Sequence, residues 1–215
     1  IIPEEEEINE RLEKARNKLV QQQILIMQKK LPVLVSFDGW GAAGKGSILG
    51  KIIKNIDPRF FKVAVMDKPT EDEKRRPFLY RYVINIPEAG KFTFMDGGCL
   101  DEVTKQKLSG KITDEEYKRK IESVKRFERQ LSDNGYLVIK FFFHIGEQEQ
   151  RKRLTRLLDD KNTRWRVSEY DLWQNQHYKK SLKAFDQFID DTSQSIAPWY
   201  IVDATDKKWA QLQIL

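Results

Sequence analysis

The sequence predicts a single α/β domain, residues 1–215, built on a parallel sheet with helices on both faces. Five apolar runs have the length and composition of buried strands: residues 31–37, 63–66, 92–95, 137–143 and 199–202. The segments between these runs are long enough for helices, and strands that alternate with helices favour a parallel sheet covered on both sides. A chain of 215 residues without a repeat or linker fits one domain.

The N-terminal segment 1–30 is expected to form an amphipathic helix that flanks the domain. Within it the helix is predicted from about residue 9 to residue 29, with charged residues on the outer side. The apolar positions that share one face are Ile8, Leu12, Ala15 and Leu19.

The next elements are predicted to be a strand, a glycine-rich turn and a helix. Residues 31–37 are apolar and β-branched, and Pro32 stands at the beginning, where a missing N–H is tolerated. Gly39 follows the strand, and apolar residues then recur at helical spacing from residue 44 to residue 56. A strand therefore points directly into a glycine loop.

Two longer helices are predicted in the second half of the chain. Thr113 and Glu116 have the spacing of a capping box, and Asn134-Gly135 ends the helix that they open. A second long helix is predicted to begin near Ser168. Its core-facing residues are expected to be Leu172, Leu182, Phe185 and Ile189.

Composition excludes several classes of protein. Hydrophobic residues make up 40% of the chain and charged residues 33%, which excludes a disordered or linker-dominated protein. One cysteine and two distant histidines predict a reducing, cytoplasmic setting without a structural metal site. No apolar run approaches the ~20 residues of a membrane helix, and the acidic N-terminus is unlike a signal peptide. The net charge of +6 favours an anionic partner.

The glycine-rich turn carries the strongest chemical signal. Residues 39–47 match the G-x-x-x-x-G-K pattern, between a predicted strand and a predicted helix. In such a loop the backbone N–H groups and the helix N-terminus bind phosphate oxygens, and Lys45 adds a full positive charge. The predicted phosphate-binding residues of this loop are Gly39, Gly41, Ala42, Ala43, Gly44, Lys45, Gly46 and Ser47. Gly46 stands where a serine or threonine usually meets Mg²⁺, so Ser47 is the alternative source of a hydroxyl.

Two charged residues follow other strands toward the same edge of the sheet. Asp96 ends the third strand and is the candidate magnesium-linked acid; the alternative is an ordinary aspartate that starts a turn before Gly97-Gly98. Arg81 lies among aromatic residues after the second strand, where an acceptor is expected. Its alternative is a surface salt bridge.

A basic region, residues 146–170, is expected to act as a lid. Lys152, Arg153 and Arg156 share one side of a predicted helix whose other side carries leucines. A lid of this charge suits closure over phosphates and the exclusion of water. The alternative is a solvated basic face.

Several motifs together resemble the family-2 polyphosphate kinases, over about Leu31 to Trp209. They occur in the family's order and spacing. These motifs are residues 39–46, Lys68-Pro69-Thr70, Leu79-Tyr80-Arg81-Tyr82, residues 127–131, residues 149–154, Trp165-Arg166 and Ala197-Pro198-Trp199-Tyr200.

The resemblance implies a phosphate-loop kinase fold of three layers, with a parallel five-stranded sheet and a helical lid. It implies transfer of phosphoryl groups between inorganic polyphosphate and AMP, ADP, GMP or GDP, with Mg²⁺. By position, Lys45 would stabilise the transferring group, Arg81 would contact phosphates or the acceptor, and Arg153 and Arg156 would belong to the lid and polyphosphate channel. The family also implies a homo-oligomer or a fused second copy of the domain.

Two positions depart from the family pattern. Gly41 stands where an aspartate is usual, and Gly97 stands where an arginine usually follows the strand-end aspartate. The loss of a charged group that acts in the transition state slows phosphoryl transfer. One hypothesis is therefore a degraded copy from a two-domain polyphosphate:AMP phosphotransferase, which binds polyphosphate as a scaffold. An ATP-dependent nucleotide kinase is a further alternative, whereas nucleic acid is not favoured because many aromatics lie in core runs.

Overall fold

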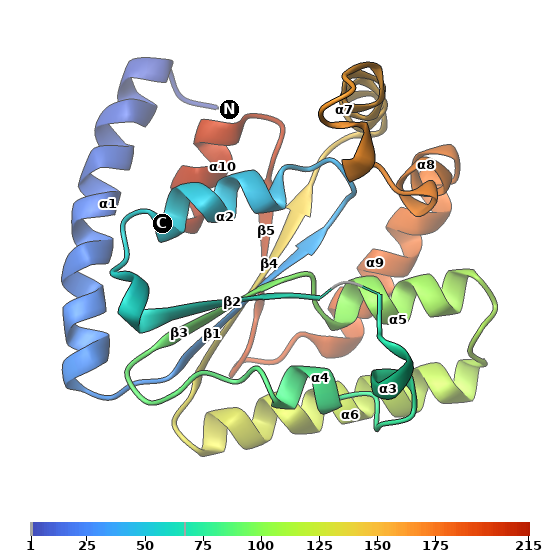
Figure 1. Cartoon of the computed structure of the whole chain (residues 1–215), viewed down its shortest axis with the longest axis horizontal. Helices are drawn as coiled ribbons and strands as arrows, with labels where there is room; N and C mark the ends of the chain where they lie inside the picture. The colour runs from blue at the N-terminus through green and yellow to red at the C-terminus, as the bar shows by residue number, and fades with distance from the viewer. Residues whose placement is uncertain (1, 67) are drawn as a thin grey trace.

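The computed structural model describes residues 2–66 and 68–215 around a five-stranded parallel sheet (Figure 1). The strand order is β2-β3-β1-β4-β5, and every pairing is parallel. The strands are β1 Val33–Gly39, β2 Phe61–Val65, β3 Phe92–Asp96, β4 Leu137–His144 and β5 Trp199–Asp203. Each predicted strand is therefore present, and the predicted α/β class is confirmed.

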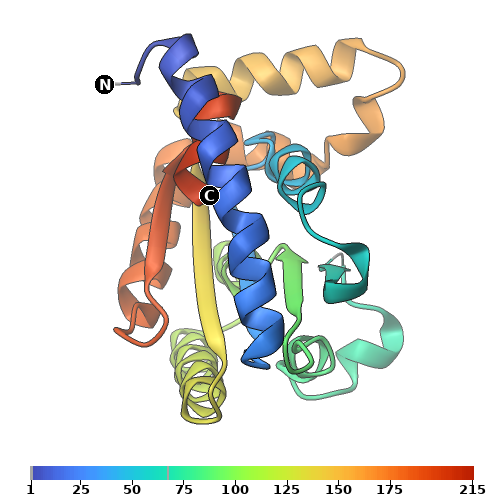
Figure 2. The same ribbon diagram turned by 90° about the vertical axis from the view of Figure 1, so that its left-hand side faces the viewer.

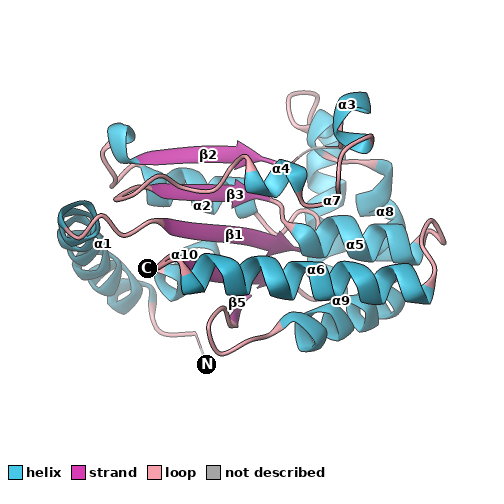
Figure 3. Ribbon diagram, turned by 90° about the horizontal axis from the view of Figure 1, so that it is seen from below, coloured by secondary structure: helices cyan, strands magenta, loops and turns pink. Residues whose placement is uncertain are grey.

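Helices cover both faces of this sheet, which makes three layers (Figures 1 and 3). On one face lie α1 Glu5–Gln28, α2 Lys45–Ile53 and α10 Lys207–Ile214. On the other face lie α5 Cys99–Leu108, α6 Asp114–Asp133 and α9 Tyr178–Thr192. The remaining helical elements are η1 Pro58–Phe60, α3 Glu71–Lys74, α4 Tyr80–Val83, α7 Glu147–Asp159, η2 Arg164–Arg166 and α8 Glu169–Gln176.

The central strand β1 ends where several loops converge. Its residues are almost all buried, because helices cover both of its sides. Phe37 lies opposite Asp96 of β3, and Gly39 lies opposite Phe143 of β4. Parallel pairing therefore brings the ends of β1 and β3, and the loops that follow them, to one edge of the sheet.

The first helix is longer than the sequence pattern predicts. It begins at Glu5, four residues before the expected start, and its buried residues are Ile8 and Leu12. It packs against the C-terminal helix α10, as Figure 2 shows, where Lys208 Nζ lies 2.6 Å from the Glu5 carboxylate. A flanking helix on the outside of the domain is confirmed.

The single long helix predicted from Ser168 is wrong. Two helices are present, because His177 has a non-helical backbone (φ −115°, ψ 38°) between α8 and α9. The break lets Tyr178 stack on Trp40 at 4.0 Å and donate its hydroxyl to the Ile145 carbonyl. Leu172, expected to face the core, is 36% exposed on α8.

Local helix signals are confirmed elsewhere. Thr113 and Glu116 form the reciprocal hydrogen bonds of a capping box at the start of α6. Between the sheet and the helices α6 and α9, Lys140 of β4 donates to both carboxylate oxygens of Glu128 at 2.9 Å and to the Thr192 carbonyl at 3.0 Å. In the described part of the chain, no helix combines the length and the apolar character that a bilayer crossing requires.

Candidate active site

The glycine loop between β1 and α2 has backbone angles that favour glycine, and it packs closely against the backbone of β4. Gly39 has φ +131°, and a Cβ there would lie 2.4 Å from the Phe143 carbonyl oxygen of β4. Gly44 has φ +92° and is the N-cap residue directly before α2. Ala42 also has a positive φ, 62°, which is uncommon for a residue with a side chain.

Lys45 is the first residue of α2 and folds back over the loop. Its ammonium group donates to the carbonyl oxygens of Gly39 at 2.9 Å and Trp40 at 3.1 Å. Within the part of the chain that the structure describes, no side chain caps this helix start. The amides of the first turn therefore remain available to an anion, and Lys45 holds a full positive charge beside them.

Four aspartates lie near Lys45 at this edge of the sheet, and three of them act electrostatically on the remaining one, Asp101. Asp96 ends β3 beside the start of α2, since a Cβ on Gly46 would lie 3.3 Å from its carboxylate. Asp38 is fully buried and accepts a 2.5 Å hydrogen bond from Ser36. Asp101 lies on α5, and its backbone N–H faces Asp38 at 3.4 Å. The fourth, Asp171 of α8, also acts electrostatically on Asp101.

Burial and mutual repulsion weaken the acidity of the inner carboxyl groups. Burial raises the pKa of Asp38, against the opposing effects of Ser36 and Lys45. Burial also raises the pKa of Asp101 to about 7, and Asp38, Asp171 and Asp96 add to that rise. Asp101 therefore changes its charge near neutral pH, next to the cation that is expected to meet phosphate.

A helical lid lies over this edge of the sheet, formed by α7, η2 and α8 (Figure 1). Three buried amide side chains join it to the loop. Gln174 accepts from the Gly41 N–H at 2.9 Å and from Gln150 Nε2 at 2.8 Å. Gln150 also donates to the Gly41 carbonyl at 3.3 Å, and Asn175 donates to Gln150 at 3.0 Å. These contacts hold the lid against the loop.

Arg153, predicted to bind phosphate from the lid, occupies a different place in this conformation. Its guanidinium donates to the carbonyls of Ala43 at 3.2 Å and Ala42 at 3.4 Å, behind the loop. It also donates to Ala204 at 2.9 Å and Thr205 at 2.7 Å. The side chain thus braces the loop against the segment after β5, and these donors face protein carbonyls instead of a ligand.

The other two predicted arginines lie in contrasting surroundings. Arg156 is exposed on α7, as expected of a lid cation. Arg81 is buried on α4, where Nε lies 3.9 Å from Glu73 and Nη1 lies 3.8 Å from Glu102. The surface salt bridge considered for Arg81 is therefore wrong, because the pairing is internal. Its contact with phosphate or an acceptor stays a prediction.

The two glycines that depart from the expected family pattern are constrained for different reasons, Gly41 by packing and Gly97 by its backbone conformation. A Cβ on Gly41 would lie 2.1 Å from a carboxylate oxygen of Asp171. Gly97 has φ +91°, which L side chains rarely adopt. The neighbouring Gly98 is pressed against the Asp38 carboxylate, at 2.3 Å from its own hypothetical Cβ. Restoring the charged residues at these positions would therefore meet steric resistance.

Comparison with known proteins identifies the family. Residues 3–215 match the family described as Polyphosphate kinase 2. The chain belongs to this family. The resemblance expected from the phosphate loop and the lid motifs is thereby confirmed, over nearly the whole chain.

Related proteins include a polyphosphate:AMP phosphotransferase from Pseudomonas syringae pv. tomato. It is 32% identical over 187 residues, which cover 87% of this chain and 38% of that protein. An ADP-polyphosphate phosphotransferase from Pseudomonas aeruginosa is 29% identical over 200 residues, or 93% of this chain and 66% of that protein.

A solved polyphosphate kinase 2 structure from Pseudomonas aeruginosa superposes on the whole chain. Its TM-score is 0.93 at 27% sequence identity, and the match covers 100% of this chain and 46% of that one. A second family structure, from Arthrobacter aurescens, gives a TM-score of 0.86 at 26% identity. The chain spans less than half of the first solved structure and about two fifths of the first curated relative.

Several residues of this family member's site were not predicted. Asp38 directly precedes the glycine loop, so its place at the end of a buried strand was a usable signal. Asp101, Asp171, Gln150 and Gln174 had no local signal, since they come from helices that meet the loop only through packing. The structure does bring Lys45 and Asp96 together with the loop, as the sequence predicted.

Proposed function

We propose that the chain is a phosphotransferase domain that moves phosphoryl groups between inorganic polyphosphate and a nucleoside mono- or diphosphate. The carrying observation is the phosphate loop, in which Lys45 lies over an uncapped helix start with four aspartates nearby. Named relatives act on polyphosphate with AMP or ADP, which supports the same substrate classes here.

The residues of the loop supply binding and charge neutralisation. A terminal phosphate would accept from the loop amides and from the first turn of α2. Lys45 would exchange its bonds to the Gly39 and Trp40 carbonyls for phosphate oxygens, so that its charge offsets the charge that develops during transfer. The amide contacts between Gln174, Gln150 and Gly41 would keep the lid closed and water excluded.

The carboxylates at the site fit a magnesium ion that is shared with phosphate. Among the described residues no three acidic, histidine or cysteine side chains form a cage for a metal. Mg²⁺ does not need one, because it commonly binds one or two carboxylates together with substrate phosphates and water. We propose that Asp96 would hold the magnesium ion, and that Asp38 and Asp101 would lie near it as additional negative charges. The ion would neutralise phosphate charge when bound.

The remaining features of the active protein are proposals on the same basis. Arg156 would contact a polyphosphate chain, and its exposure on α7 supports this role. Self-association, or fusion to a second copy of the domain, fits relatives that are longer than this chain. Cys99 forms no disulfide, which fits a cytoplasmic protein.

The test is transfer from polyphosphate to each acceptor. The chain is incubated with Mg²⁺, polyphosphate and AMP, ADP, GMP or GDP, and products are separated by chromatography. We expect product with at least one acceptor, and a loss of about 100-fold or more in rate for Lys45→Ala, because a preorganised charge is removed. A thermal melt of the variant checks that it is folded.

Two outcomes would oppose the proposal. Polyphosphate binding that weakens with salt, without any product, would instead indicate the scaffold function. Consumption of ATP without polyphosphate would indicate an ordinary nucleotide kinase. Either result leaves the family assignment intact.

A further inference from the structure

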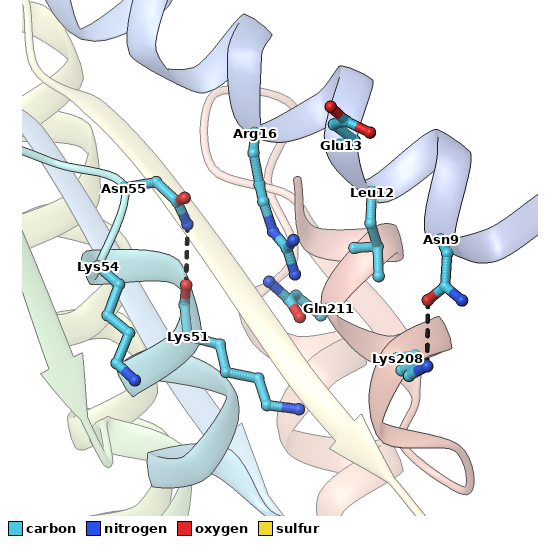
Figure 4. A pocket seen from close by; sticks show the side chains of 9 residues that line it. All are labelled: Asn9, Leu12, Glu13, Arg16, Lys51, Lys54, Asn55, Lys208 and Gln211. Atoms are coloured by element: carbon cyan, nitrogen blue, oxygen red, sulfur yellow. Dashed lines mark hydrogen bonds between the residues drawn. The ribbon is translucent and has the colours of Figure 1, made fainter.

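A second polar hollow lies at the opposite end of α2 from the phosphate loop. It has a volume of about 620 Å³ and lies between α1, α2 and α10 (Figure 4). Along α2, Lys51 and Lys54 are about 9 and 14 Å beyond Lys45, from the helical rise of ~1.5 Å per residue. The hollow is therefore separate from the loop, although one helix connects the two.

The side chains around this hollow carry excess positive charge. Arg16, Lys51 and Lys54 line it, and none of them has an ion-pair partner within residues 2–66 and 68–215. Lys208 lines it too and is paired with Glu5. Glu13, which Figure 4 shows on α1, is the one carboxylate among the described residues that line the hollow. Unbalanced cations in a recess favour an anionic ligand.

A buried hydrogen-bond donor lies in the wall of the same hollow. Gln211 of α10 is only 1% exposed, and its Nε2 has no hydrogen-bond partner in the described part of the chain. Figure 4 shows this amide between α1 and α10, close to the Arg16 side chain. Because a buried donor without an acceptor costs free energy, a ligand that offers acceptor oxygens would relieve this cost.

The chemistry of the lining selects the class of ligand. Guanidinium, ammonium and amide donors all match phosphate oxygens, and none of the described lining residues is an aromatic that could stack a nucleobase. We infer that the hollow between α1, α2 and α10 is a second anion site, which binds an inorganic phosphate chain through Arg16, Lys51, Lys54 and Gln211. The ligand is either a distant part of the polyphosphate whose end occupies the loop, or a separate short phosphate chain.

Direct binding tests the site without any need for phosphotransfer. Tripolyphosphate is titrated at low salt into ¹⁵N-labelled Lys45→Ala chain, and the Gln211 side-chain amide, assigned by Gln211→Leu, is followed by NMR. We expect this amide to shift and saturate. Lys51→Gln with Lys54→Gln should weaken the binding at least about ten-fold and flatten its salt dependence, since two charge-assisted contacts are lost.

A control with the same change in net charge separates the site from general attraction. Lys18→Gln with Lys179→Gln removes two exposed lysines outside the hollow and should change the affinity by less than about two-fold. An unmoved Gln211 amide at millimolar tripolyphosphate would overturn the inference. Equal weakening in both double variants would overturn it as well.

Steady-state kinetics then distinguish the two sources of the ligand. They compare the wild type with the Lys51 and Lys54 double variant, both of which retain Lys45. If the apparent KM for long-chain polyphosphate rises in the Lys51 and Lys54 double variant but not for tripolyphosphate, the hollow holds the far part of the substrate chain. If neither KM changes while the NMR shift persists, a separate phosphate chain binds there. Both results support the site, and the binding experiment stands even if the domain proves to be without transfer activity.

Discussion

At the scale of single residues, the site depends on glycines that are matched to particular neighbours. Gly39 admits the β4 backbone, and Gly41 admits the Asp171 carboxylate. Asp171 is itself held as part of a capping box with Ser168, so it does not move aside freely. Gly41 is thus packed against a residue far along the chain, and a substitution at Gly41 should change the position or stability of Asp171.

Gly41→Ala tests this match. The new methyl group would occupy the position of the Asp171 carboxylate, so we expect the free energy of unfolding to fall by about 1–3 kcal/mol in urea titrations. Adding Asp171→Gly should recover part of the loss, with a coupling free energy above about 0.5 kcal/mol.

Gly50→Ala is the matched control. Gly50 lies within α2, and among the described residues no atom outside its own helical turn lies within 4 Å of a Cβ added there. The substitution should therefore stabilise the protein by about 0.5–1 kcal/mol. Unchanged stability of Gly41→Ala would contradict the geometry.

Asp101 predicts a pH dependence of stability. Its pKa is about 7 in the folded chain and 3.8 without perturbation, so between these values the folded state holds a proton that the unfolded state has lost. Its contribution to stability is therefore complete below pH 3.8 and is lost as the pH rises to 7, at up to about 1.4 kcal/mol per pH unit.

The measurement compares the wild type with Asp101→Asn by urea unfolding at pH 5, 6, 7 and 8. The variant should gain stability relative to the wild type from pH 5 to pH 7, and the difference should then level off. The comparison cancels groups that are common to both proteins and do not interact with Asp101. Asp57, whose pKa is lowered to about 2, affects stability only at pH values below this range. Parallel curves would show that Asp101 titrates normally.

At the scale of elements, the lid helices have two kinds of basic residue. Arg153 on the inner side of α7 is only partly exposed and donates to carbonyls of the loop and of the segment after β5. Arg156 on the same helix is exposed. Arg153 therefore braces the loop, whereas Arg156 is the exposed arginine that we propose for polyphosphate binding.

Arg153→Ala and Arg156→Ala separate these roles. Arg153→Ala should lower the free energy of unfolding by about 2 kcal/mol or more, because it leaves carbonyls near the loop without donors. Arg153→Lys should not restore it, since a single ammonium cannot reproduce the fork of bonds. Arg156→Ala should change stability by less than about 0.5 kcal/mol and raise the KM for polyphosphate. Chemical unfolding and steady-state kinetics give the two readouts; the reverse pattern would refute the assignment.

At the scale of the whole molecule, a buried ion pair ties the layer behind the site together. Lys140 in the central part of the sheet contacts Glu128 of α6 and the last residue of α9. Burial raises the pKa of Glu128, while Lys140 opposes that rise. The helices α6 and α9 that support the lid side of the fold therefore share a polar anchor inside the core.

Removal of one partner should be costly. Lys140→Met leaves Glu128 buried without its cation, and we expect a loss of about 3–5 kcal/mol in urea unfolding. Lys140→Met combined with Glu128→Leu should cost less than the single change, because no charge then remains buried. A double variant less stable than the single one would contradict this, because it would show that Glu128 stabilises the fold even without Lys140.

The sequence alone predicted what depends on neighbours in the chain. The strands, the capping box at Thr113 and the phosphate loop all follow from spacing over a few residues, because backbone conformation is set by local sterics and local hydrogen bonds. The first helix was predicted to begin four residues too late, since residues 5–7 are all acidic and carry no apolar residue to mark the start. The break at His177 was missed because the pattern on both sides is helical.

The composition and the loop determined the class of protein, an α/β domain for phosphate chemistry, and the family motifs narrowed it further. Only the tertiary structure decided which side chains complete the site. Gly41 and Gln174 lie 133 residues apart in the chain, and Arg153 and Ala204 lie 51 apart. Such contacts follow from how helices pack across a sheet, which depends on the whole core. For the same reason, the lysines of α2 meet Arg16 and Gln211 only once three helices are assembled.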